Sequence, residues 1–338
     1  MNLILGLSIL VSFVVSVIAL PHWIRKCKEV DLLWEDMNKY NHPRNVASSG
    51  GIIVITSFIL GVLTYIAIKT FIIRGNTIEL KIFSLLTVIL ILAIVGLVDD
   101  LLGWKKGGLS VRLRLLLAFA AAIPLIVINA GEPIIDIPLF GLMDIGLFYP
   151  LILIPLGIAG ATFTYNMLAG FNGLESGQGI IILSFLSFVA YITGSSWLAL
   201  IGLIMVVSLI VFYMYNKYPA KIFPGDILTY SIGALIAGMA ILGNFEKIAV
   251  FIFIPYIMET FLKLRGKLKK QSFGIAQKDG SLKLPYDKIY GITHLSIFII
   301  SKFKKKVYEK DVVYLINAFQ ILLCLIALFV FRNTLFFK

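Results

Sequence analysis

Two adjacent carboxylates, Asp99 and Asp100, stand at the end of an apolar run that covers residues 82–98. A run of this length crosses most of a bilayer, so the pair is expected at the mouth of a membrane span. Charged side chains are costly at that depth unless a cation holds them there. The pair therefore needs a metal ion, a basic partner or a proton from a substrate, and this need points to an enzyme.

Two further polar stretches interrupt apolar segments. Residues 165–179 contain Asn166, Asn172 and Glu175 among several glycines, and Asp226 follows a Pro-Gly pair before another apolar run. Irregular backbone of this kind survives at membrane depth only inside protein or beside a wet cavity. A glycine hinge would not need the asparagines and the glutamate. A helix N-cap is the structural alternative for Asp226.

These carboxylate and amide oxygens, with no Cys or His cluster, suit a hard cation such as Mg²⁺ or Mn²⁺. Mg²⁺ usually takes one or two protein ligands and shares its other positions with phosphate and water. Arg114 and the lysine-rich residues 265–311 are expected to rim the same cavity. Basic groups beside an acidic metal site favour an anionic phosphate. The residues alone predict a membrane enzyme acting on a phosphorylated, lipid-linked substrate.

The composition predicts the elements that must position these groups. The chain has 338 residues, of which 59% are hydrophobic and 14% charged, with a mean hydropathy of +0.98. A soluble domain would carry nearly twice that charged fraction, so the expected fold is an all-α polytopic membrane protein forming a single domain over residues 1–338. At about 20 residues per span, about ten transmembrane helices are expected. They are residues 2–20, 50–71, 81–99, 111–130, 147–168, 178–194, 196–214, 227–243, 247–264 and 312–331.

The net charge of +12 is distributed unevenly. Lys and Arg concentrate in the loops after odd-numbered spans, so these loops are expected in the cytoplasm and both termini outside. Because topology explains the basic residues, anionic membrane lipids are the expected surface partner and nucleic acid is not. The first span lacks the basic start of a cleaved signal peptide and is too long for one. Cys27 and Cys324 lie too far apart to suggest a disulfide framework.

Two loops carry structure of their own. Residues 130–146 alternate apolar and polar side chains around Gly141, which predicts a small external β-hairpin. Residues 265–311 predict a cytoplasmic α/β loop after the ninth span, with a hairpin turn at Asp279-Gly280 and a helix over 290–306. His294 within that helix is expected to be packed or solvated rather than a ligand.

Four motifs together carry a resemblance: EDMNK at 35–39, GLVDDLLG at 96–103, NMLAGFNGLESGQ at 166–178 and NKYPAKIFPGD at 216–226. With them, the chain resembles the polyprenyl-phosphate N-acetylhexosamine-1-phosphate transferases over essentially its whole length. It is most similar to the archaeal and eukaryotic dolichyl-phosphate GlcNAc-1-phosphate transferases. The NGLE signature separates this branch from the bacterial phospho-MurNAc-pentapeptide enzymes.

The resemblance implies catalytic and metal-binding roles at five positions. Asn166 and Asp226 match the family's Mg²⁺ ligands, and Asp99 and Asp100 match its essential aspartate pair. Arg114 aligns with a lysine that meets the lipid phosphate. One of the two aspartates is expected to position or deprotonate the polyprenyl phosphate.

The resemblance also implies substrate contacts. Phe223 matches an aromatic side chain that stacks on uracil, and Asn172 matches a residue that contacts the uridine. Met37 falls where the backbone of the first loop meets the nucleotide, and Glu175 of the NGLE signature is assigned to substrate binding. Lys269 aligns loosely with a basic group that grips the pyrophosphate.

Two positions depart from the family pattern. Ser48 stands where the eukaryotic enzymes carry a sugar-contacting glutamate, and Gly103 stands where relatives carry Asn or Lys. These departures concern the identity of the sugar rather than the reaction class.

The implied reaction transfers GlcNAc-1-phosphate from UDP-GlcNAc to polyprenyl (dolichyl) phosphate, releasing UMP, as the first step of lipid-linked oligosaccharide synthesis for N-glycosylation. The membrane would be the cell membrane of a prokaryote or the endoplasmic reticulum of a eukaryote, and a homodimer is left open. One alternative is the same reaction with another UDP-N-acetylhexosamine for a surface glycan. The alternative from another class is a transporter, which predicts polar residues near mid-span and an inverted repeat.

Overall fold

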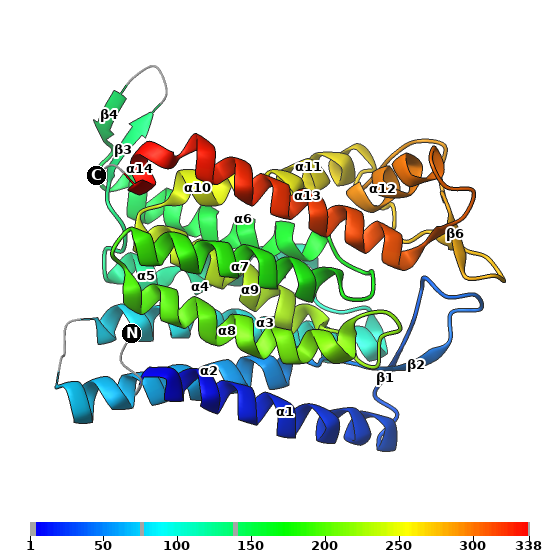
Figure 1. The fold of residues 1–338 in the computed structure, drawn as a ribbon, viewed down its shortest axis with the longest axis horizontal. Helices are drawn as coiled ribbons and strands as arrows, with labels where there is room; N and C mark the ends of the chain where they lie inside the picture. Colours follow the sequence, from blue (N-terminus) through cyan, green and yellow to red (C-terminus); the bar gives the residue numbers. More distant parts are fainter. Residues whose placement is uncertain (1–4, 75–77, 138–140, 337–338) are drawn as a thin grey trace.

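The structure, a computed structural model, describes residues 5–74, 78–137 and 141–336. Long helices lie side by side with their axes roughly aligned, and short strands and loops cover both ends (Figure 1). The helices are α1 (Gly6–Glu29), α2 (Gly51–Ile68), η2 (Lys69–Ile73), α3 (Glu79–Lys106), α4 (Val111–Ala121), α5 (Ile123–Val127), η3 (Tyr149–Leu153), α6 (Ile154–Met167), α7 (Leu174–Ile192), α8 (Ser196–Asn216), α9 (Gly225–Gly243), α10 (Glu246–Ile252), α11 (Ile254–Arg265), α12 (Ile292–Ser301), α13 (Glu309–Val330) and α14 (Arg332–Phe336).

Among the described residues, eight helices are long and apolar enough to cross a membrane. The other two predicted spans, 111–130 and 247–264, each form two shorter helices. Both breaks precede a proline in the first turn of the second helix, Pro124 in α5 and Pro255 in α11. Proline lacks the backbone N–H of a continuous helix and its ring clashes with the preceding turn. Hydropathy alone therefore predicts a single span in each place.

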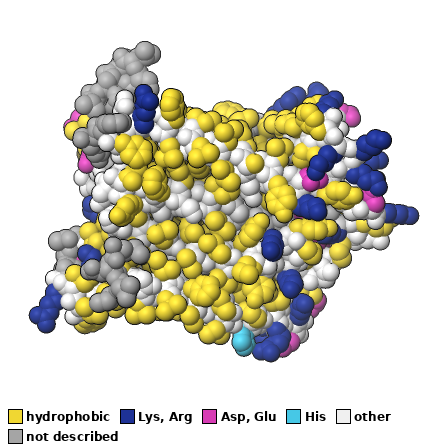
Figure 2. Space-filling view, in the orientation of Figure 1, with side chains coloured by type: hydrophobic (Ala, Val, Ile, Leu, Met, Phe, Trp, Pro, Cys, Tyr) yellow, Lys and Arg dark blue, Asp and Glu magenta, His cyan; other side chains and the backbone are white. Residues whose placement is uncertain are grey.

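The outer surface of the bundle is apolar. The face seen in Figure 2 is largely hydrophobic, whereas Lys and Arg gather at the end that carries α12 and the loops near β1 and β6 (Figure 1). The start of α1 and the end of α14 both lie at the opposite end (Figure 1). An apolar belt with charge at its edges is the pattern of an integral membrane protein.

Helix α9 lies at the centre of the bundle, and nearly all of its residues are buried. It packs between α3 and α6 at points where glycine allows close approach. A Cβ on Gly96 of α3 would lie 2.5 Å from the backbone nitrogen of Ile227, and one on Gly233 would lie 2.6 Å from the carbonyl oxygen of Ala161. These contacts bring the carboxyl ends of α3 and α6 against the beginning of α9.

Three small antiparallel sheets lie outside the bundle. Strands β3 (Ile134–Ile137) and β4 (Gly141–Asp144) form the predicted hairpin, although its turn falls outside the described residues. Strands β5 (Ile275–Ala276), β6 (Ser281–Lys283) and β7 (Val307–Tyr308) form a sheet beside α12. Strand and helix thus both occur within 265–311, but the helix ends at Ser301 rather than at the predicted residue 306. Sequence analysis missed β1 (Leu33–Glu35) and β2 (Arg44–Ala47) in the first loop.

The first loop also pairs with the segment that precedes α9. The backbone N–H of Phe223 donates to the carbonyl of Ala47 over 2.8 Å, and the N–H of Gly50 donates to the carbonyl of Phe223 over 2.9 Å. The backbone of Phe223 is thus fixed against the end of the first loop, which is far from it in the sequence.

Candidate active site

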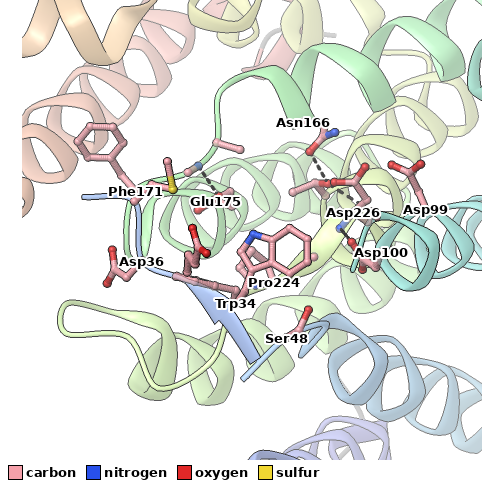
Figure 3. A pocket seen from close by; sticks show the side chains of 18 of the residues that line it. Trp34, Asp36, Ser48, Asp99, Asp100, Asn166, Phe171, Glu175, Pro224 and Asp226 are labelled. Atoms are coloured by element: carbon pink, nitrogen blue, oxygen red, sulfur yellow. Dashed lines mark hydrogen bonds between the residues drawn. The ribbon is translucent and has the colours of Figure 1, made fainter. Parts of the chain in front are cut away.

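A cavity opens at the end of the bundle where α3, α6, α7 and α9 meet the first loop (Figure 3). Six carboxylate side chains line it, with no Lys, Arg or His among the described lining residues. The lining residues are Trp34, Glu35, Asp36, Met37, Ser48, Asp99, Asp100, Gly103, Asn166, Ala169, Gly170, Phe171, Glu175, Phe223, Pro224, Gly225, Asp226, Thr229 and Phe273. The cavity therefore presents a concentrated negative charge that favours cations.

Asp99 and Asp226 share one guanidinium. Nη1 of Arg114 lies 3.0 Å from Oδ2 of Asp99 and 3.6 Å from Oδ2 of Asp226. The same nitrogen donates to the hydroxyl of Tyr230 over 3.2 Å. The other oxygen of Asp99 accepts from the backbone N–H of Leu109. One positive charge thus faces two carboxylates, so the pair retains a net negative charge.

Asp100 has a different environment from its neighbour. Its Oδ1 accepts from the backbone N–H of Asp226 over 2.7 Å, and its Oδ2 lies 3.4 Å from the N–H of Ile227. These groups are free N–H donors at the start of α9, where negative charge is favourable. Asp226 makes no side-chain cap of its own helix. The N-cap expected as the alternative for Asp226 is therefore supplied by Asp100 from α3.

Gly225 makes this cap possible. It has φ +72°, a conformation that glycine adopts without strain. A Cβ at this position would collide with the carboxylate of Asp100. The Pro-Gly-Asp sequence thus turns the chain into α9 and leaves the side chain of Asp226 facing the cavity (Figure 3).

Asn166, at the end of α6, reaches the same wall of the cavity. Its Oδ1 accepts from the hydroxyl of Thr229 over 3.0 Å. Thr229 lies one helical turn after Asp226, so the amide and the carboxylate face the cavity together (Figure 3). Thr229 was not predicted, although its spacing from Asp226 places it on the same helix face.

The oxygen atoms on this wall suit a divalent cation that takes few protein ligands. The described residues include no group of three or more His, Cys, Asp or Glu side chains arranged to hold a metal ion. Mg²⁺ needs only one or two protein ligands when phosphate and water complete its coordination. We call the side of the cavity that carries Asp99, Asp226 and Asn166 the acidic wall. The amide oxygen of Asn166 and the carboxylate of Asp226 on this wall fit that requirement.

The opposite wall, which we call the loop wall, is formed by the loop between α6 and α7 together with Met37 of the first loop and Phe273 of the loop after α11. Oε1 of Glu175 accepts from the N–H of Gly170 over 2.7 Å, which closes this loop on itself. The hydroxyl of Tyr165 donates to the backbone carbonyl of Glu175. Aromatic side chains also line the cavity, including Phe223 and Phe273. An apolar and aromatic surface beside an acidic one suits a ligand with a planar ring and a charged tail.

The structure brings most of the predicted site residues together. Met37, Glu175 and Phe223 line the cavity with the acidic residues. Asn172 is buried behind the lining and donates from Nδ2 to Asp36 over 3.1 Å. Lys269 is exposed in the loop after α11 and is not among the lining residues.

Other lining residues were missed by sequence analysis. Trp34 directly precedes the EDMNK motif, and Asp36 is the second residue of the motif but was not singled out as a site residue. Phe273 lies in a loop without a recognisable motif, and it reaches the cavity by packing against Gly170. No local signal in the sequence marks it.

Comparison with known proteins gives concordant matches. A family model described as glycosyl transferase family 4 matches residues 82–244. A protein of Saccharolobus solfataricus, named as a UDP-N-acetylglucosamine–dolichyl-phosphate N-acetylglucosaminephosphotransferase, is 36% identical over 332 residues, 97% of each chain. A protein of the same name from Sulfolobus acidocaldarius is 32% identical, covering 95% of this chain and 94% of the relative.

A more distant relative belongs to another branch. The phospho-N-acetylmuramoyl-pentapeptide-transferase of a Wolbachia species is 27% identical over 74% of this chain and 78% of its own. The family match runs from α3 to α9 and contains Asp99, Asp100, Arg114, Asn166 and Asp226. Since the archaeal relatives extend the likeness over nearly the whole length, the chain belongs to glycosyl transferase family 4.

Proposed function

We propose that this protein transfers GlcNAc-1-phosphate from UDP-GlcNAc to a polyprenyl phosphate of the dolichyl type. The products are GlcNAc-diphospho-polyprenol and UMP. The observation that carries the proposal is the single cavity in which acidic and amide side chains from α3, α6 and α9 meet at one end of an apolar bundle. The names of the two archaeal relatives supply the donor and the acceptor.

The donor side of the site would bind the nucleotide and its diphosphate. Phe223 offers an aromatic face for the uracil ring, and Met37, whose backbone would meet the nucleotide, lines the same cavity. Asn166 and Asp226 would hold Mg²⁺. When bound, this ion supplies positive charge that stabilises the diphosphate. The acidic lining has no basic side chain to do so among its described residues.

The acceptor side is centred on Arg114. Its guanidinium would attract the phosphate of the lipid, while Asp99 lies 3.0 Å from Nη1. Both oxygens of Asp100 already face backbone N–H groups of α9. Asp99 also has a donor at each oxygen, the N–H of Leu109 and the guanidinium of Arg114, but that guanidinium is the group assigned to the lipid phosphate. We therefore assign the proton from that phosphate to Asp99, while Asp100 fixes the position of Asp226.

The transfer itself is a displacement at phosphorus. An oxygen of the lipid phosphate forms a bond to the β-phosphorus of UDP-GlcNAc. The bond from that phosphorus to the bridging oxygen breaks, and UMP leaves with the bridging oxygen. We place the cavity on the cytoplasmic side, because Lys and Arg gather at this end of the bundle (Figure 2). Both termini would then lie on the other side, where α1 begins and α14 ends (Figure 1).

A substrate panel tests the proposal. Purified protein is incubated with UDP-GlcNAc, UDP-GalNAc or UDP-glucose and with dolichyl or undecaprenyl phosphate, with and without Mg²⁺. UMP release and the mass of the lipid product are measured. We expect equal amounts of UMP and GlcNAc-diphospho-lipid only with UDP-GlcNAc, acceptor and divalent ion together. Preference for UDP-GalNAc would contradict the assigned sugar, and substrate flux into vesicles without UMP release would contradict transfer altogether.

A further inference from the structure

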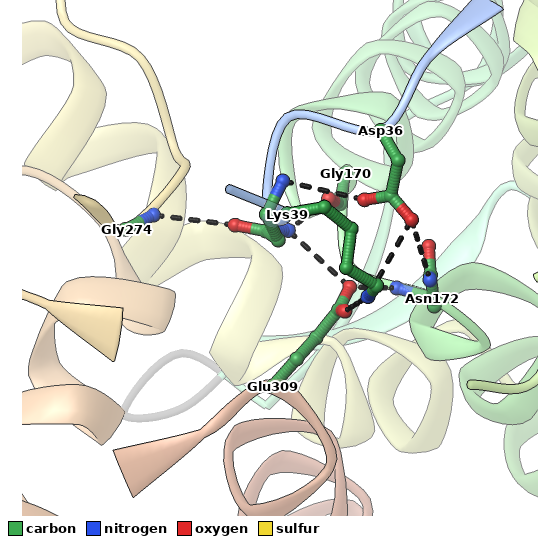
Figure 4. Close-up of polar contacts among 7 residues, drawn as sticks. Asp36, Lys39, Gly170, Asn172, Gly274 and Glu309 are labelled. Atoms are coloured by element: carbon green, nitrogen blue, oxygen red, sulfur yellow. Dashed lines mark hydrogen bonds and ion pairs between the residues drawn. The ribbon is translucent and has the colours of Figure 1, made fainter. Parts of the chain in front are cut away.

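Glu309 is a buried carboxylate that the proposed mechanism does not use. It is the first residue of α13, and only 1% of its surface is exposed. Oε1 accepts from the backbone N–H of Asn172 over 2.7 Å and from Nδ2 of Asn38 over 3.3 Å. Oε2 forms an ion pair with Lys39 over 2.5 Å (Figure 4). One side chain thus joins the first loop, the α6–α7 loop and α13.

The partners of Glu309 are connected to one another. Asp36 lies 3.5 Å from Nζ of Lys39 and accepts from Nδ2 of Asn172 over 3.1 Å. Asn38 donates to the carbonyl of Gly170 over 2.8 Å and accepts from the N–H of Gly274 over 3.3 Å (Figure 4). We call Asp36, Asn38, Lys39, Asn172 and Glu309 the clasp. A third loop, around Gly274, is therefore joined to the first two.

Each loop held by the clasp contributes a neighbouring residue to the cavity. Met37 lies between two clasp residues, Phe171 precedes Asn172, and Phe273 precedes Gly274; all three line the cavity. These segments have little regular secondary structure, so helix or sheet ladders do not fix them. Leaving Glu309 buried without its donors is costly, which makes the three loops order together.

We propose that Glu309, paired with Lys39, is a positioning residue that fixes the loop wall of the cavity and thereby sets the affinity for the nucleoside-diphosphate sugar. The inference rests on the function proposed above. Glu309 acts through its partners, because it is not among the lining residues. The acidic wall made by α3 and α9 has its own support in Asp100 and Arg114, so its chemistry does not depend on the clasp.

Kinetics of Glu309→Gln and Lys39→Met test the inference. Each variant loses a charged hydrogen bond, so we expect the KM for UDP-GlcNAc to rise about 10-fold or more. We expect kcat to fall less than about 3-fold and the KM for dolichyl phosphate to stay unchanged, since the acidic wall is intact. Calorimetry with UMP should show the same loss of affinity. The KM of the double variant should be no higher than that of the more impaired single variant, because both changes break the same ion pair.

Asp311→Asn is the matched control. Asp311 lies in the same first turn of α13 but pairs with exposed Lys304 and the N–H of Tyr308. We expect wild-type kinetics from it. A fall in kcat at unchanged KM in both Glu309→Gln and Lys39→Met would contradict the inference.

Hydrogen exchange separates the clasp from the proposed reaction. In Glu309→Gln we expect faster amide exchange in residues 36–39 and 170–174, with no change at the start of α9. Unchanged exchange in these loops would overturn the clasp whatever the kinetics show. Fast exchange in the loops together with wild-type UMP affinity would overturn its link to the nucleotide. Failure of the wild-type protein in the substrate panel would count against the proposed function and leave the exchange result intact.

Discussion

On the acidic wall of the cavity, Asp99 and Asp226 share the guanidinium of Arg114. Behind the loop wall, Glu309 alone has three hydrogen-bond donors. The acidic wall belongs to membrane-spanning helices, which glycine contacts bring together. The loop wall belongs to irregular segments that only side chains connect. The two walls therefore differ both in charge balance and in the contacts that hold them in place.

The difference separates the two tasks of the site. Carboxylates that exceed their counter-charges attract cations, and this is what a metal-assisted phosphoryl transfer requires. A carboxylate whose hydrogen bonds are satisfied within the protein instead holds the structure around it. Substitutions on the acidic wall should change the reaction rate. Substitutions on the loop wall should change binding.

The largest loss is expected from Asp226→Ala. The variant removes a carboxylate that faces the cavity and is assigned to the metal ion, so we expect exchange of labelled UMP into UDP-GlcNAc to fall about 10³-fold. Asp144→Ala, at the end of β4 on the far side of the bundle, serves as the control. Wild-type exchange by the Asp226 variant would remove this residue from the mechanism and the acidic wall from its assigned role.

A smaller loss is expected from Arg114→Gln. Without the guanidinium, Asp99 and Asp226 lose their shared counter-charge and the lipid phosphate loses its cation, so turnover should fall about 10²-fold. Arg114→Lys should retain more activity, because the positive charge remains. The control is Arg112→Gln, an exposed arginine on the same helix. Initial rates at varied dolichyl phosphate measure the effect, and equal rates for Arg112→Gln and Arg114→Gln would exclude the assigned role.

Gly225→Ala tests the support of the acidic wall rather than its charge. The new Cβ would collide with Asp100 and force a left-handed conformation on alanine. We expect a loss of about 1–3 kcal/mol in stability, seen as a lower melting temperature in detergent. Gly160→Ala in α6 adds a methyl group where nothing lies within 4 Å, so it should melt like the wild type. An unaltered melting temperature for the Gly225 variant would show that the Asp100 cap contributes little.

The acidic wall could be predicted from the sequence, because each of its residues interrupts or ends an apolar run. Asp99, Asn166 and Asp226 stand out against their neighbours, and topology places them at the same membrane face. Their local partners could not be predicted in the same way. The cap of α9 by Asp100 joins residues 126 positions apart, and the local pattern offered that cap only as the alternative role of Asp226 itself.

The loop wall was predicted less well, for a physical reason. Its order comes from contacts between distant segments, such as Asn38 with Glu309, 271 positions apart. Polar residues in the loop between two spans look like a solvated surface until the fold buries them. Hydropathy likewise counts apolar residues without detecting where proline divides a helix, so spans 111–130 and 247–264 were predicted as continuous.

The smallest effect is expected beneath the loop wall, at His294 of α12. It is fully buried, contacts the ring of Tyr286, and follows Thr293, whose hydroxyl donates to the carbonyl of Ser272 beside Phe273. Burial lowers the pKa of His294 below its ordinary value of 6.5, and the nearby charge of Lys263 adds to this.

As the pH falls below 6.5, His294 takes up a proton in the unfolded chain but not in the folded protein. The stability of the fold therefore decreases until the pH has fallen through the pKa of the folded state. Over that range, the melting temperature of the wild type should fall about 2 °C further than that of His294→Phe. His22→Phe, an exposed histidine in α1, should behave like the wild type, and parallel pH curves for all three proteins would show that His294 does not link the loop wall to pH.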